Sequence, residues 1–139
     1  MRVAVVYYAE KQRDRLKELA QALARGIQSQ NVLVDVMDAR DLNGKLTIYQ
    51  YVALGTEVTG NFGGKIPPGL AAFLKTSGHL VGKRCFAFLP NRGLRREKSL
   101  LALMKVMEAE GMLVAYSDLL QGAAAAESAG KKLDIQPKH

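Results

Sequence analysis

The segment from Arg2 to Ile27 constrains this chain most, because it reads as a buried strand followed directly by an amphipathic helix. Residues 3–8 form the run VAVVYY, whose β-branched and aromatic side chains are typical of a strand covered on both faces of a parallel sheet. After a polar turn, apolar residues recur at three- and four-residue spacing, as on one stripe of a helix: Leu16, Leu19, Ala20, Leu23, Ala24 and Ile27. Such a βα unit predicts an α/β fold.

Four further apolar segments predict strands, at 32–37, 51–55, 84–89 and 112–116, and helices are expected after Pro67 and over 94–110 and 123–133. The first of these strands alternates in polarity, which suits an edge strand. The connection after it carries the turn signal Asn43-Gly44, so we expect a single turn around Leu42 or an irregular segment there. The 139 residues therefore predict a single domain, 1–139, with a three-layer α/β sandwich and a frayed tail from Asp134 to His139.

Composition narrows the class of protein further. The chain is 48% hydrophobic and 24% charged, as in ordinary soluble domains, and no apolar run reaches the ~20 residues of a membrane span. We therefore expect no membrane partner and take the cytoplasm as the default location. The single cysteine, Cys85, lies inside the apolar run CFAFL, which favours a buried structural thiol. His79 and His139 lack the spacing of metal ligands.

The excess of positive charge is gathered at two places in the sequence. The net charge is +7, and basic residues follow the first and fourth predicted strands: Lys11, Arg13, Arg15, Lys17, Arg92, Arg95, Arg96 and Lys98. If both strands are parallel, these clusters lie at one edge of the sheet and could meet an anionic ligand or an acidic partner; scattered, solvated charge is the alternative. Nucleic acid is the least favoured partner, because the basic loops lack interleaved aromatic residues.

The turn after the first strand, Ala9 to Arg15, contains no Gly, Ser or Thr, the residues that usually cradle a phosphate. Lys11, Arg13 and Arg15 either hold an anion by side-chain charge or belong to an ordinary solvated first helical turn with Asp14 as its cap. We favour the solvated turn.

The second informative loop runs from Thr56 to Pro68 and holds three glycines and two prolines. Phe62 stands among these glycines without an apolar neighbour. Its ring either stacks on a flat ligand or folds back onto the loop, and the sequence does not choose between the two.

Several of these segments together resemble the flavodoxins and small flavodoxin-like domains, over nearly the whole chain. They are the first strand at 3–8, LAQALARGI at 19–27, Gly55-Thr56, FGGKIP at 62–67 and GKRCFAF at 82–88. The resemblance implies a five-stranded parallel sheet of order 2-1-3-4-5 and FMN as the cofactor.

That family binds FMN with three loops, which this sequence matches unequally. The phosphate-loop pattern Ser/Thr-x-Thr-Gly-x-Thr is missing, so Lys11, Arg13 and Arg15 would have to hold the phosphate. Glu57 stands where the second loop commonly has a proline, and Asn91 or Arg92 would cover the other face of the ring. The resemblance implies these second-loop residues: Thr56, Glu57, Thr59, Gly60, Asn61, Phe62 and Gly63.

Two functions follow from the resemblance and the charge. The first is flavin binding and electron transfer, with an acidic redox partner because this chain is basic. The second is a cofactor-free flavodoxin-like binding or interaction module whose basic rim meets an anionic ligand or an acidic partner. No acid–base pair, nucleophile–base pair or metal cluster can be read from the spacing, so any redox chemistry would be that of the flavin.

Overall fold

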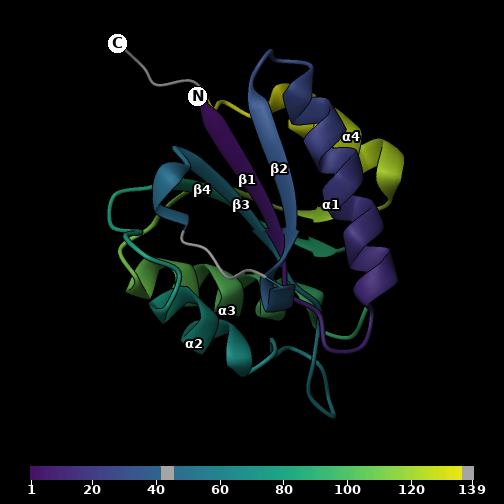
Figure 1. The fold of residues 1–139 in the computed structure, drawn as a ribbon. Helices are drawn as coiled ribbons and strands as arrows, with labels where there is room; N and C mark the ends of the chain where they lie inside the picture. Colours follow the sequence, from purple (N-terminus) through teal and green to yellow (C-terminus); the bar gives the residue numbers. More distant parts are fainter. Residues whose placement is uncertain (42–45, 136–139) are drawn as a thin grey trace.

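A computed structural model describes residues 1–41 and 46–135, and its centre is a sheet of five parallel strands (Figure 1). The strands are β1 (Arg2–Tyr7), β2 (Leu33–Asp38), β3 (Tyr51–Gly55), β4 (Arg84–Pro90) and β5 (Leu113–Leu120). Their order, β2-β1-β3-β4-β5, confirms the expected topology. The order reverses between β1 and β3, so the crevice at the carboxyl ends of these two strands is where a ligand site is expected.

Helices cover both faces of the sheet, as Figure 1 shows. The helices α1 (Arg13–Gln28) and α4 (Ala123–Lys132) lie on one face, and α2 (Gly69–Lys75) and α3 (Arg96–Ala109) lie on the other. The connection from β2 to β3 holds two 3-10 turns, η1 (Ala39–Asp41) and η2 (Leu46–Ile48), and the predicted turn at Leu42 to Gly44 lies outside the described residues. Among the described residues, no helix is both long and apolar enough to cross a membrane.

Two glycines allow α1 and α4 to cross at backbone contact. A Cβ atom added to Gly26 would lie 2.0 Å from the carbonyl oxygen of Glu127, and one added to Gly130 would lie 2.3 Å from that of Leu23. Arg25 reinforces the crossing with an ion pair to Glu127 at 3.1 Å. The short α4 therefore depends on α1 for most of its packing.

Three expectations about element ends are corrected. Helix α1 begins at Arg13 after the cap position of Gln12, so Asp14 already lies in the first turn and does not cap the helix. Strand β5 runs four residues beyond Tyr116, because its ladder with β4 continues to Pro90. The tail is not frayed where it begins, since Ile135 is 1% exposed and packs into the core between the sheet, α1 and α4; residues 136–139 lie outside the described part.

The cysteine is a structural thiol, as predicted. Cys85 lies in β4 with no exposed surface, and burial raises the pKa of its thiol to about 12. We expect Ellman's reagent at pH 8 to leave the native protein unmodified, since the reactive thiolate is scarce and out of reach, and to titrate one thiol at once in denaturant. Rapid labelling of the native protein would contradict this placement.

Candidate functional site

The loop that follows β1 directs three backbone N–H groups at one buried carboxylate. The N–H groups of Glu10, Lys11 and Gln12 donate to Oε1 of Glu57 over 2.6, 3.1 and 3.4 Å. Glu57 is 2% exposed, and it lies close to the start of α1, where the helix dipole favours a negative charge. A group of N–H donors around one oxygen is how such loops hold an anion, so this loop is already filled by the chain itself.

The two parallel strands β1 and β3 bring Glu57 to that loop. Tyr8 donates its N–H to the carbonyl of Gly55 at 2.9 Å, which extends the ladder past the strand ends. Thr56 is fully buried; its hydroxyl donates to the carbonyl of Tyr8 at 2.7 Å, and its N–H donates to the carbonyl of Phe88 at 3.2 Å. Both hydrogen-bond donors of Thr56, its hydroxyl and its N–H, are therefore used within the protein. The next residue, Glu57, is held facing the amides of the first loop.

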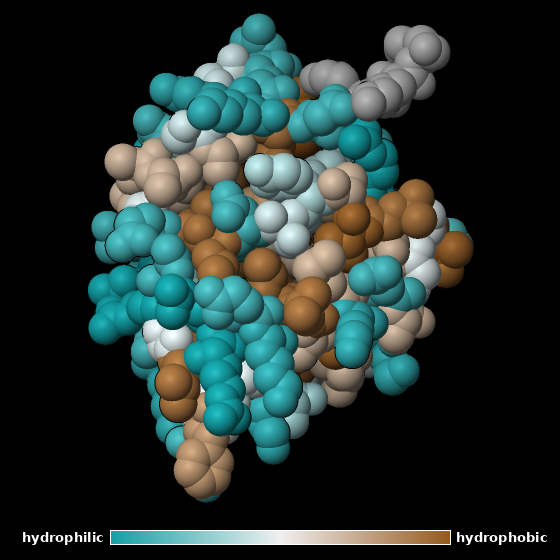
Figure 2. All heavy atoms as spheres, turned by 180° about the vertical axis from the view of Figure 1, so that it is seen from behind, coloured by the Kyte–Doolittle hydropathy of each residue, from teal (hydrophilic) through white to brown (hydrophobic). Residues whose placement is uncertain are grey.

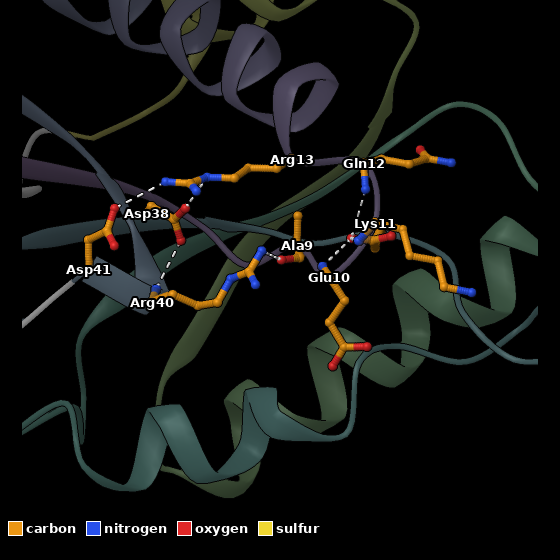
Figure 3. A network of polar contacts seen from close by, with 9 residues as sticks. Ala9, Glu10, Lys11, Gln12, Arg13, Asp38, Arg40 and Asp41 are labelled. Atoms are coloured by element: carbon orange, nitrogen blue, oxygen red, sulfur yellow. Dashed lines mark hydrogen bonds and ion pairs between the residues drawn. The ribbon is translucent and has the colours of Figure 1, made fainter.

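Charged side chains from the end of β2 hold the same loop from its other side (Figure 3). Arg40 donates from its guanidinium to the carbonyl of Ala9, and its N–H donates to Oδ1 of Asp38 at 2.9 Å. Arg13 places Nε 2.6 Å from Oδ2 of the buried Asp38, an ion-pair contact rather than an aligned hydrogen bond, and also pairs with Asp41 at 3.1 Å. The carboxylate of Asp38 raises the pKa of Arg13.

The three cations of the first turn do not converge on one point. Arg13 is turned toward β2 and away from the amides that hold Glu57, whereas Lys11 and Arg15 are exposed (Figure 3). Asp38, Arg40 and Asp41 were not expected at this edge. Their signal in the sequence was the run DARD at the end of the second strand, which parallel pairing places beside the first loop.

The loop after β3 is a short hairpin whose tip is solvated. Thr59 and Lys65 pair through two backbone hydrogen bonds, and the carbonyl of Lys65 accepts from the hydroxyl of Ser99 in α3 at 2.8 Å. Phe62, at the tip, is 73% exposed. The alternative in which its ring folds back onto the loop is therefore wrong, and stacking on a ligand stays a prediction.

The loops after β3 and β4 touch each other. Gly64 donates its N–H to the carbonyl of Leu94 at 3.2 Å, and a Cβ atom at Gly63 would lie 2.1 Å from that same oxygen. Asn91 is engaged with the side chains of Gln121 and Arg96. The space left between the two loops is a cavity of about 250 Å³, lined by Gln12, Val58, Gly60, Asn61, Gly63, Pro90, Arg92, Gly93 and Leu94.

A larger cavity, of about 710 Å³, lies beside β5 and α4. It is lined by Tyr51 and Arg84, the first residues of β3 and β4, and so sits near the amino end of the sheet. The switch between β1 and β3 and the charged loops lie at the carboxyl end, where the 250 Å³ cavity and another of about 460 Å³, lined in part by Arg13, Asp38 and Asp41, are found. The 250 Å³ cavity lies between the second and third loops and is taken as the candidate site.

Solved structures with the same arrangement include several flavodoxins. A flavodoxin from the domain Archaea shares 22% identity and a TM-score of 0.70, with 94% of each chain covered. Flavodoxin 1 from Bacillus cereus shares 19% sequence identity with a TM-score of 0.67, and the match covers 92% of this chain and 94% of the flavodoxin. The chain has a flavodoxin-like fold. A flavodoxin of Streptococcus pneumonia TIGR4 shares 12% sequence identity with a TM-score of 0.66, and the match covers 94% of this chain and 96% of the flavodoxin. No family model and no curated protein matches the sequence.

The residues of this flavodoxin-like chain do not fit FMN as they stand. The carboxylate of Glu57 uses the amides that a phosphate would need, and the loop adds no hydroxyl donor. A phosphate placed in this loop would lie next to the carboxylate of Glu57, which is buried, and like charges repel more strongly where water is excluded. The direct contact between Gly64 and Leu94 further narrows the space between the other two loops.

Proposed function

We propose that this domain works without a resident flavin, as a flavodoxin-like binding module that meets an acidic partner at the carboxyl edge of its sheet. The observation that carries the proposal is the carboxylate of Glu57 on the amides of Glu10, Lys11 and Gln12. Hydrogen bonds to a charged group contribute roughly 1.5–3 kcal/mol each. Displacing Glu57 at a net cost of about 4 kcal/mol would weaken FMN about a thousandfold, because each 1.4 kcal/mol is tenfold.

The size of the cavity supports the same function. At about 250 Å³ it falls below the roughly 300–1,000 Å³ of ordinary small-molecule sites. Enlarging it requires the loops to part, which breaks the bond from Gly64 to Leu94. The basic side chains around it are exposed, and a protein partner can reach them without any such movement.

A flavin-dependent electron carrier is the second candidate function. It is favoured by the position of the 250 Å³ cavity between the second and third loops, where the flavodoxin resemblance puts the flavin ring. In that function Glu57 swings away from the first loop, Phe62 stacks on the ring, and an acidic redox partner docks on the basic edge.

Flavin titration separates the two functions. We expect the purified protein to be colourless, and FMN and riboflavin to keep their fluorescence unquenched in the presence of high-micromolar protein, since Glu57 denies the phosphate its donors. The fluorescence of each flavin is followed against protein concentration at low and at physiological salt. Co-purification with stoichiometric FMN, or FMN binding that exceeds riboflavin binding and strengthens at low salt, would establish the electron carrier instead.

A further inference from the structure

The second and third loops form one continuous surface at the lower end of the molecule. Gly63 and Gly64 contact the backbone of Leu94, so neither loop presents a separate face. We name the exposed side chains around this contact the two-loop surface; they are Phe62, Lys65, Arg92, Leu94, Arg95 and Lys98. Seen from behind, the lower end of the molecule shows a small apolar area bordered by hydrophilic side chains (Figure 2).

Two residues of the two-loop surface are apolar. Phe62 is 73% exposed and Leu94 is 63% exposed. A single exposed apolar residue is ordinary in a soluble protein, but here an aromatic and an aliphatic side chain stand on loops in direct contact. Aromatic residues and arginine are the types enriched where proteins bind each other, and they carry most of the binding energy there.

The same two loops and the start of α3 carry four exposed cations. Arg92, Arg95, Lys98 and Lys65 are exposed, and none of them has a carboxylate within ion-pair distance among the described residues. Lys98 and Arg95 both lie beside Gly64, since a Cβ atom there would lie 3.1 Å from Cδ of Lys98 and 3.4 Å from Cβ of Arg95, and Lys65 is the next residue in the chain. Unpaired like charges on these adjoining segments raise the local potential, which the carboxylates of a partner would neutralise.

The backbone of Arg95 supports a role for its side chain. Arg95 has a φ of 56°, in the left-handed region that glycine adopts without strain. An arginine at such a position stabilises the fold less than glycine would. The backbone therefore gives no reason for an arginine at this position, whereas a contact of its guanidinium with a partner would.

The chemistry of the surface favours an acidic protein over a nucleic acid. Single strands are held by successive aromatic platforms along a basic groove, whereas Phe62 is the one ring on this surface and Leu94 offers no face for a base. An apolar side chain of a peptide could pack on these exposed residues, and neighbouring carboxylates could pair with the four cations.

We propose that the two-loop surface is a docking site for an acidic protein segment that carries an apolar anchor residue. The anchor packs on Phe62 and Leu94, and its flanking Asp or Glu residues pair with Arg92, Arg95, Lys98 and Lys65. This inference rests on the proposed function, in which the domain is a binding module.

The test begins with a selection of random peptides displayed on phage against the full chain. The peptides enriched on the wild-type protein should combine several Asp or Glu residues with a Leu, Phe or Trp. Synthetic versions of them should bind at least tenfold more weakly to Arg95→Glu/Lys98→Glu and several-fold more weakly to Phe62→Ser. Lys132→Glu in α4, on the opposite face of the sheet, makes the same kind of charge change and should leave binding unchanged.

The variant Arg95→Gly separates a direct loss of peptide binding from a loss caused by misfolding. This variant removes the left-handed strain, so its melting temperature should equal or exceed that of the wild type while peptide binding falls several-fold. Enrichment of neutral or basic peptides, equal losses in Lys132→Glu, or tighter binding of an oligothymidylate than of the acidic peptides would overturn the proposal. If the protein binds FMN and the peptide results are as expected, the proposed flavin-free function is overturned and the docking site stands.

Discussion

Glu57→Ala is expected to lower the free energy of unfolding by about 2–4 kcal/mol, which is a fall in melting temperature of roughly 10 °C. The reason is that the N–H groups of Glu10, Lys11 and Gln12 lose their common acceptor in a closed loop. Thermal and urea unfolding, followed by circular dichroism, measure the change. Glu57→Gln keeps an oxygen acceptor without the charge, so its free energy of unfolding should lie between those of Glu57→Ala and the wild type.

The same variant should become sensitive to anions. Once Glu57 is removed, sulfate or phosphate can accept from the freed amides and restore part of the lost melting temperature, whereas the wild type should gain only the general effect of the salt. Glu10→Ala is the matched control, because Glu10 lies in the same loop with an exposed side chain that takes no part in the network of Figure 3. Equal losses in the two variants would show that the buried carboxylate does not stabilise the loop.

Gly130→Ser is expected to destabilise the fold by about 3 kcal/mol or more. A Cβ atom at this position would lie 2.3 Å from the carbonyl oxygen of Leu23 and 2.8 Å from the backbone nitrogen of Ile27, so two helices must move apart. The gain in helix propensity over glycine is a few tenths of a kcal/mol and does not offset that movement. Urea unfolding measures the loss, and the midpoint should fall without a change in the number of transitions.

Gly122→Ser provides the control for that prediction. Gly122 caps the start of α4 in an extended conformation, and a Cβ atom there meets nothing within 4 Å. Serine is a favoured residue at this position, so stability should stay within about 0.5 kcal/mol of the wild type or rise slightly. If both glycine variants behave alike, α1 and α4 do not cross as closely as the structure has them.

The strands could be predicted because their signal is local, whereas their order in the sheet was implied by the resemblance to flavodoxins. Residues 3–8 and 84–89 are apolar on both faces, and the alternation in the second strand marks an edge; all three features are visible over six residues. Element ends were harder to predict. Helix α3 begins two residues later than expected, because the left-handed Gly93 and Arg95 delay it, and backbone angles of that kind leave no periodic signal.

The candidate site was predicted in position and only in part in its contacts. The sequence placed the first loop, Phe62 and Arg92 at one edge of the sheet, and it identified the missing hydroxyls of the phosphate loop. It counted Arg13 with Lys11 as one cationic group, whereas Arg13 pairs with Asp38 on the neighbouring strand. That pairing joins residues 25 positions apart and depends on the register of β1 with β2.

The sequence by itself determined the alternation of strands and helices, the buried cysteine and the basic residues that follow the first and fourth strands, since each depends on the pattern of side chains along the chain. Only the tertiary structure decided what fills the first loop. Glu57 is a single acidic residue in a polar stretch, and nothing near it in the sequence marks it as an acceptor. The pairing of β1 with β3 carries it to amides 45 to 47 residues away, because parallel strands bring distant segments to one edge.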